Sequence, residues 1–113
     1  MQPPFVSLIG IDDFKKVELK VGKVLEAQRI EGSRKLIRLV VDLGSEKRQI
    51  VAGLAERYAP ETLVGKYVVV VANLQPRMLM GYESQGMLLA TCDKPTLLTL
   101  LEPSDEHIGE HVC

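Results

Sequence analysis

The sequence predicts an all-β fold, a small five-stranded barrel with short helices. Apolar and polar residues alternate at a period of two through much of residues 18–52, which is the pattern of half-buried strands. The run "KYVVVV" is continuous and β-branched, as in a central strand covered on both faces. Only "LAERYAPETLVG" has a helical composition, and Pro60 limits it to a turn or two.

A single helical turn is expected before the first strand. In "IDDFKKVEL", Asp12 is a candidate helix N-cap, and Phe14 and Val17 are three residues apart, as on one face of a helical turn. From Glu18 the period is two, which predicts a long strand whose apolar face is formed by Leu19, Val21, Leu25 and Ala27. Gly22 lies inside this strand, where it permits a bulge or sharp coiling.

The remaining strands follow in order. "EGSRK" is a turn, and after it the inward positions are Ile37, Leu39, Val41 and Leu43. "LGSEKR" predicts a hairpin loop that leads to a third strand, "RQIVAG". "KYVVVVANL" and "GMLLAT" are the fourth and fifth strands, and the residues after them predict extra, short C-terminal strands and turns. This pattern indicates a small β-barrel, and a short helix between strands three and four is the arrangement of an OB-fold barrel.

The length predicts one domain, residues 11–113, after a Pro-containing lead-in of residues 1–10. With no Trp, two Phe and three Tyr, its core must be aliphatic. No run approaches the roughly 20 apolar residues of a membrane helix, and the first residues lack a signal-peptide pattern, so we expect a cytoplasmic protein without a membrane partner.

The charge is unevenly distributed, although the net charge is only −1. Residues 15–77 contain 13 Lys or Arg and 7 Asp or Glu, whereas the rest of the chain contains 1 and 8. If the second and third strands pair as a hairpin, their outward cations form a basic strip: Arg34, Lys35, Arg38, Lys47 and Arg48. A basic OB-fold strand face is where nucleic acid normally lies, and a set of solvated strand faces is the alternative.

We expect no enzyme activity, metal or cofactor. No glycine-rich phosphate loop or nucleophile motif is present. His107 and His111 are four residues apart, but Gly109 lies between them and no upstream ligand pair exists. Cys92 and Cys113 are too few for a disulfide framework, and we expect a buried small apolar residue and a tail residue, respectively.

The stretch "NLQPRMLMGYESQGMLLAT" resembles the signature of the tRNA-binding domain family. The resemblance extends to "IDDFKKVELKVGKVLEAQRIEGSRKLIRLVVDLGSEKRQIVAGL" and "LVGKYVVVVANL", so it covers nearly the whole chain. Members of this family are OB-fold modules, either free-standing dimeric proteins or parts of methionyl-tRNA synthetases. The resemblance therefore implies sequence-independent binding to the elbow of folded tRNA, as a homodimer, free-standing or with a methionyl-tRNA synthetase.

The resemblance also implies which residues shape the RNA-facing cleft. The motif positions are Asn73, Arg77, Ser84, Gln85 and Met87, and Lys35 matches a family lysine before strand two. Together with the basic strip, the expected RNA-binding residues are Lys35, Arg38, Lys47, Arg48, Asn73, Arg77, Ser84, Gln85 and Met87. The family commonly has a lysine where this chain has Met78, which predicts one phosphate contact fewer.

Several of these residues have structural alternatives. Pro76 stiffens the turn before Arg77, which would present a guanidinium to phosphate, although Arg77 could instead pair with Glu83. Ser84 could reach a phosphate or a 2′-hydroxyl, or only bond its own backbone. Met87 could rest on a ribose or a base, or belong to the core. Because the three tyrosines do not share a face, we expect recognition of folded RNA by shape and phosphates rather than by base stacking.

A second hypothesis is peptide binding. A related branch of the family, of the same fold, acts as an export-associated chaperone that binds peptides, and the methionine-rich "MLM" at 78–80 would suit a promiscuous apolar surface. An apolar seam of Leu97, Leu98, Leu100 and Leu101 could serve a dimer or close the barrel.

Overall fold

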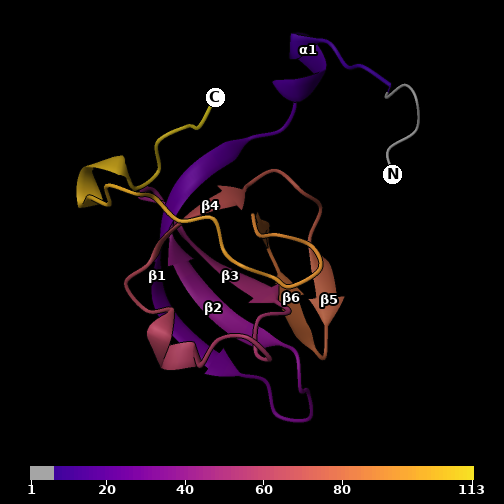
Figure 1. Ribbon diagram of the computed structural model, residues 1–113, viewed down its shortest axis with the longest axis vertical. Coiled ribbons are helices and arrows are strands. Elements are labelled where there is room, and N and C mark those ends of the chain that lie inside the picture. Colours follow the sequence, from indigo (N-terminus) through magenta and orange to yellow (C-terminus); the bar gives the residue numbers. More distant parts are fainter. Residues whose placement is uncertain (1–6) are drawn as a thin grey trace.

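Five antiparallel strands form the main sheet of the computed structural model, which describes residues 7–113 (Figure 1). Their order is β3-β2-β1-β4-β7. The bounds are Leu19–Arg29 for β1, Ile37–Asp42 for β2, Lys47–Ala52 for β3, Tyr67–Val71 for β4 and Met87–Leu88 for β7. The sheet coils into a nearly closed barrel, which confirms the predicted five-stranded barrel of the OB type.

The residues of β1 that point to the interior do not follow one alternating pattern along the whole strand. The pairing with β2 shifts between Val24 and Glu26, so Leu25 is the extra residue of a β-bulge. Val24 is fully buried as a result, whereas the prediction placed Leu25 on the inner face with Val21. Gly22 lies just before the bulge, where β1 passes closely over β2 and a Cβ would stand 2.4 Å from Val41 Cγ1.

The core is aliphatic, as the composition predicts. Its members come from every strand of the main sheet and from the segments between them: Val24, Ile37, Leu39, Val41, Leu43, Ile50, Leu54, Ala55, Leu63, Val68, Val70, Leu88 and Leu97. Because each strand of the barrel offers alternate residues to the interior, the outward positions of β2 and β3 remain available to carry charge.

The helices are short. α1 spans Ile11–Phe14 and buries no residue, and it stands clear of the barrel in Figure 1. Its N-cap is Gly10, so the prediction of Asp12 as N-cap is wrong. Two 3-10 helices follow, η1 over Pro60–Thr62, between strands three and four as predicted, and η2 over Asp105–His107. None of the helices in residues 7–113 is long and apolar enough to cross a membrane.

The C-terminal segment pairs with the barrel through single bridges rather than through the short strands predicted. These bridges are Val68↔Thr99, Ala90↔Leu97 and Lys20↔His111. Of the predicted leucine seam, Leu97 is buried in the core while Leu98 and Leu101 are exposed. The predicted lead-in, residues 1–10, lies mostly outside the described residues.

Candidate nucleic-acid interface

The motif segment forms a hairpin that was not predicted. Between β4 and β7, residues 77–79 and 82–84 pair as β5 (Arg77–Leu79) and β6 (Tyr82–Ser84), a second two-stranded sheet. Met80 and Gly81 form the turn with φ of 51° and 85°, as a two-residue hairpin turn with positive φ at both positions requires. Arg77, Met78 and Tyr82 are exposed on this hairpin.

Ser84, the last residue of β6, and Gln85 and Gly86 after it form the segment that closes the barrel. The Ser84 hydroxyl accepts a hydrogen bond from the backbone N–H of Val51 at 3.0 Å and donates to the carbonyl of Gly86 at 3.2 Å. Gln85 N–H donates to the Gln49 carbonyl at 2.8 Å, and Gln49 N–H donates to Gln85 Oε1 at 3.2 Å. Ser84 and Gln85 therefore satisfy the otherwise open edge of β3.

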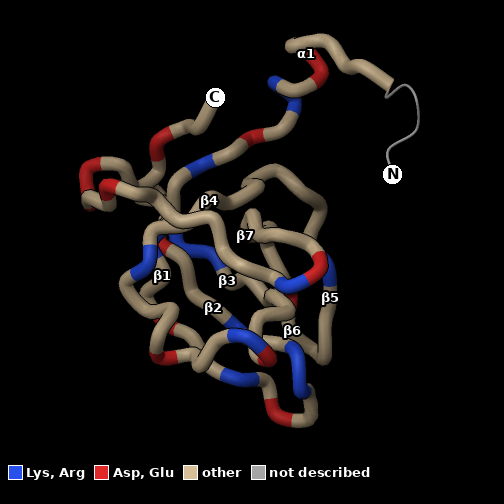
Figure 2. Tube along the Cα trace, viewed as in Figure 1, with Lys and Arg blue, Asp and Glu red and all other residues tan. Residues whose placement is uncertain are grey.

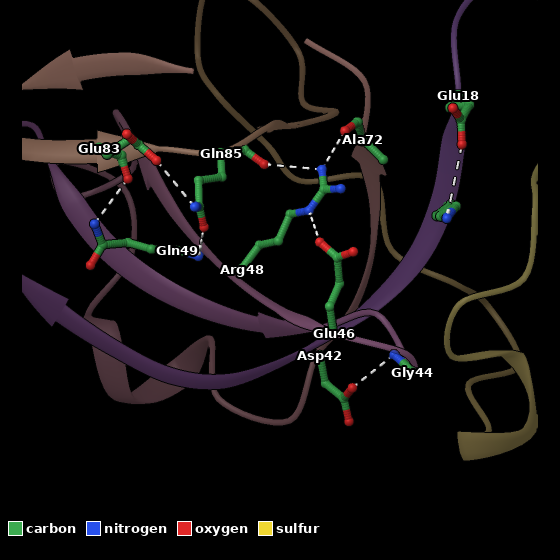
Figure 3. A network of polar contacts seen from close by, with 10 residues as sticks. Glu18, Asp42, Gly44, Glu46, Arg48, Gln49, Ala72, Glu83 and Gln85 are labelled. Carbon is green, nitrogen blue, oxygen red and sulfur yellow. Dashed lines mark hydrogen bonds and ion pairs between the residues drawn. The ribbon is translucent and has the colours of Figure 1, made fainter. Parts of the chain in front are cut away.

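Arg48 is held in a polar network beneath this closure (Figure 3). Its Nε donates to the Glu46 carboxylate, and its Nη1 donates to the carbonyls of Ala72 and, at 3.4 Å, Gln85. The hydrogen bond from Arg48, and then its charge, lower the pKa of Glu46 from its ordinary value. The guanidinium thus joins β3, the end of β4 and the motif segment, and most of its donors are already used.

Two other predicted site residues also have intramolecular partners. Asn73 Oδ1 accepts from Glu18 N–H at 2.8 Å, and its Nδ2 donates to the Lys16 carbonyl at 2.6 Å, which joins the end of β4 to the start of β1. Arg38 Nε donates to Gln49 Oε1 at 2.6 Å, and no hydrogen bond is formed by its Nη groups among residues 7–113. Sequence reasoning missed Gln49, whose Nε2 also donates to the Glu83 carbonyl at 2.9 Å.

Four predicted residues remain free of such contacts. Lys35, Lys47 and Arg77 are exposed, and their charged groups form no ion pair or hydrogen bond within the part of the chain that the structure describes. The alternative pairing of Arg77 with Glu83 is not formed, since Glu83 accepts instead from Gln85 Nε2 at 3.1 Å. Met87 is 48% exposed, so its side chain is at the surface rather than in the core.

Arg77 and Met87 meet at two adjoining hollows. The smaller hollow, about 100 Å³, lies between the hairpin and the segment 84–86 that closes the barrel, and it is also lined by Leu74, Gln75 and Ser84. The other, about 350 Å³, lies beside β3 and is lined mainly by apolar side chains. A groove with an apolar floor and a free guanidinium at its rim can accept an apolar ring together with an anionic group.

Neither cysteine is buried. Cys92 and Cys113 are both exposed and free, so the prediction of a buried Cys92 is wrong: the segment "CDKP" forms a surface turn. His107 faces Glu110, with Nδ1 at 3.2 Å from Oε1. Within residues 7–113, no three His, Cys, Asp or Glu side chains are grouped as a metal site would require.

The chain is similar in sequence and in fold to known proteins. Residues 19–111 match the family model described as "Putative tRNA binding domain". A methionine–tRNA ligase of Thermotoga maritima is 65% identical over 92 residues, which are 81% of this chain but only 15% of that protein. The chain therefore spans about a sixth of the length of such curated relatives.

Two solved structures have the same fold. One is a methionyl-tRNA synthetase-related protein from Pyrococcus horikoshii, with a TM-score of 0.86 and 39% identity over 96% of this chain and all of that one. The other is the chaperone CsaA from Bacillus anthracis, with a TM-score of 0.84 and 26% identity over 95% of this chain and all of that one. By the match over residues 19–111, the chain belongs to the tRNA-binding domain family.

Proposed function

We propose that this chain is a non-catalytic module that binds the elbow of folded tRNA without reading its sequence. The observation that carries the proposal is the family match over residues 19–111, which includes the whole motif. The exposed cations Lys35, Lys47 and Arg77, of which Arg77 lines the two hollows beside the motif, support it, since Lys and Arg contacts to phosphate dominate the affinity for nucleic acid and carry no sequence information. Domain bounds of 11–113 are part of the same proposal.

The predicted site residues have two roles in this proposal. Lys35, Lys47, Arg77 and Met87 contact the RNA directly, because their exposed ends have no partner among residues 7–113. Arg38 contributes through its remaining donors. Arg48, Asn73, Ser84 and Gln85 hold the closure of the barrel, so their effect on RNA is exerted mainly through the position of the hairpin.

The module would deliver tRNA to a methionyl-tRNA synthetase, either as part of the same chain or in trans. Its relatives include proteins named methionine–tRNA ligase, of which it spans a small part, so the catalytic activity would be in other segments or in a partner. By holding the outer corner of a tRNA, the module raises the local tRNA concentration at the enzyme. Such a role belongs in the cytoplasm, where aminoacylation takes place.

A homodimer is also part of the proposal. Around α1 and the C-terminal residues, apolar side chains remain exposed: Ile11 by 64%, Phe14 by 38%, Val17 by 42% and Val112 by 36%. They line a hollow of about 290 Å³. A second copy that covers this face would remove it from water, and a stable dimer needs about 800 Å² per partner. Sedimentation velocity across a concentration series tests this state.

A titration of unfractionated tRNA at rising salt tests the function. We expect binding at low salt that weakens as salt increases, because counterions are released from the neutralised phosphates. Arg77→Ala should weaken binding to all isoacceptors and reduce by about one the slope of log binding constant against log salt concentration (the salt slope). Lys66 is an exposed cation away from the groove, so Lys66→Ala should leave the affinity and the salt slope unchanged. Loss confined to one isoacceptor would contradict recognition by shape.

The second candidate is a peptide-binding chaperone of the same fold. The similarity to CsaA favours it, as do the exposed side chains of Met78 and Met80 on the hairpin, 65% and 56% exposed. Binding of an unfolded polypeptide that tRNA cannot displace, together with no tRNA binding at low salt, would favour the chaperone.

A further inference from the structure

The two hollows beside the motif are part of a longer trough. The hollow of about 350 Å³ adjoins a third one of about 580 Å³, and the two share Gly53 and Pro95. The hollow of about 350 Å³ and the smaller one of about 100 Å³ share Arg77 and Met87. The three hollows therefore lie in a row, here called the trough, from the β5–β6 hairpin, past the end of β3, to the loop around residues 92–95.

The chemistry of the trough changes along its length. Its middle is apolar and is lined by Leu36, Leu54, Leu97 and Met87, among others. The far end is charged, with three cations (Lys35, Arg57 and Lys94) and two carboxylates (Glu56 and Asp93). An apolar middle suits the face of a base or a ribose, while a cluster of cations suits a phosphate.

The three cations are held by their backbones, and their charged ends are free. The Lys35 carbonyl accepts from Ala55 N–H at 2.9 Å, and Arg57 N–H donates to the Leu54 carbonyl at 3.1 Å. The Lys94 carbonyl accepts from Thr91 Oγ1 at 2.7 Å. Over residues 7–113, none of the three charged groups forms an ion pair or a side-chain hydrogen bond. The charged groups are therefore available to an anion, although each long side chain that binding orders costs about 0.5–1.5 kcal/mol in entropy.

We infer that the charged end of the trough binds the phosphate of an unpaired nucleotide of the RNA, and that Arg57 and Lys94 are RNA-binding residues beyond the motif. The inference rests on the proposed function. The two carboxylates favour a nucleotide over a featureless polyanion, because they can accept hydrogen bonds from an exocyclic amine or a ribose hydroxyl. The volume of about 580 Å³ is within the range of small-ligand sites.

The first test measures tRNA affinity against salt for the double variant Arg57→Gln/Lys94→Gln. We expect binding about tenfold weaker and a salt slope lower by about 0.7, the value for one single-strand phosphate. Lys66→Gln, an exposed cation that does not line the trough, should match the wild type. If the double variant keeps the wild-type slope while Arg77→Ala loses affinity, the inference is overturned and the proposed function stands. If the wild type binds no tRNA, the proposed function itself fails.

A second test uses a probe that the chain already contains. Cys92 is exposed and lines the charged end of the trough, whereas Cys113 is exposed at the end of the chain. Saturating tRNA should slow the alkylation of Cys92 by N-ethylmaleimide several-fold and leave that of Cys113 unchanged, as read by peptide mass spectrometry. Equal rates at Cys92 in free and bound protein would overturn the inference.

The same assay distinguishes the kind of ligand. A blunt RNA duplex without unpaired nucleotides should leave Cys92 reactive even when a gel shift shows that it is bound. If the duplex protects Cys92 as well as tRNA does, the site does not require an unpaired nucleotide. If an unfolded polypeptide protects Cys92 and bound tRNA does not, the charged end of the trough is part of a peptide site.

Discussion

Ser84 is a motif residue whose hydroxyl is used inside the protein. It is 5% exposed and accepts from the Val51 N–H. Ser84→Ala leaves that buried N–H without a partner, so we expect a loss of about 1–3 kcal/mol in the free energy of unfolding. Urea unfolding should show a lower midpoint with an unchanged m value. Ser45→Ala, at an exposed loop position, is the matched control and should leave the midpoint unchanged.

The salt dependence of tRNA binding separates this role from a direct contact. If Ser84 acts through the fold, the variant should keep the wild-type salt slope at temperatures where it is folded. Unchanged stability together with weaker tRNA binding would instead support the direct contact that the family resemblance implies.

Gly86, two residues later, is fixed by its backbone: its φ is 145°, and a Cβ there would stand 3.0 Å from the Val71 carbonyl oxygen.

At the scale of the elements, the sequence was sufficient wherever local periodicity decides the structure. β2 buries the residues that its alternating pattern assigns to the interior, and β3 and β4 form in the stretches that the sequence predicts as the third and fourth strands. The pattern failed in β1, since the bulge at Leu25 depends on pairing with β2 and Gly22 only permits it. It failed again at β5–β6, because Met80 is not a residue that signals a turn with positive φ.

The sequence could indicate which residues are candidates for the site, but not which of them hold the fold and which remain free at the surface. Arg48, Asn73 and Ser84 each have long-range partners, which lie between 24 and 57 positions away in the chain. Neither composition nor spacing can indicate such partners, since they meet only when the barrel closes. Arg57 and Lys94 were missed for the same reason: each is an isolated cation in sequence, and only the fold brings them to one hollow.

The hairpin turn offers a way to stabilise the β5–β6 element. Met80 has φ of 51°, a conformation that costs a residue other than Gly, Asn or Asp about 1 kcal/mol. Met80→Asn should therefore raise the free energy of unfolding by up to about 1 kcal/mol, and little packing is lost because Met80 is 56% exposed. Met78→Asn, on the regular strand β5, is the matched control and should give no gain. Equal shifts in urea midpoint for both variants would contradict the explanation.

At the scale of the whole molecule, the charge asymmetry of the chain becomes a spatial one. Figure 2 shows acidic positions close together around η2, on the opposite side of the barrel from the β5–β6 hairpin in Figure 1. The trough that starts at this hairpin ends among Lys35, Arg57 and Lys94. An RNA polyanion would be attracted to the trough side and repelled from the η2 side, which would orient it during the encounter.

One carboxylate adds side-chain contacts between η2 and the barrel to the backbone hydrogen bonds that already join the C-terminal segment to β1. Asp105 accepts a hydrogen bond from the Tyr67 hydroxyl of β4. It also forms an ion pair with Lys23 of β1, whose Nζ is 3.0 Å from Asp105 Oδ1. The hydrogen bond from Tyr67, followed by that from Lys23, lowers the pKa of Asp105 from its ordinary value of 3.8. These contacts join the C-terminal segment to two strands of the main sheet. Their loss should therefore lower the stability of the whole domain rather than that of one loop.

The pH dependence of stability tests this attachment. Because the pKa of Asp105 is lower in the folded state, its contribution is complete above the ordinary value of 3.8 and is lost as pH falls through the lower folded value. Asp105→Asn should therefore lower the Tm between pH 5 and 8, and the difference from the wild type should shrink below about pH 4. Circular dichroism melts across this range measure it. Asp93→Asn, an exposed carboxyl whose side chain has no partner within residues 7–113, is the control, and it should follow the wild type at each pH. A Tm difference for Asp105→Asn that stays constant down to pH 2 would mean that the substitution acts through packing and not through the charge of Asp105.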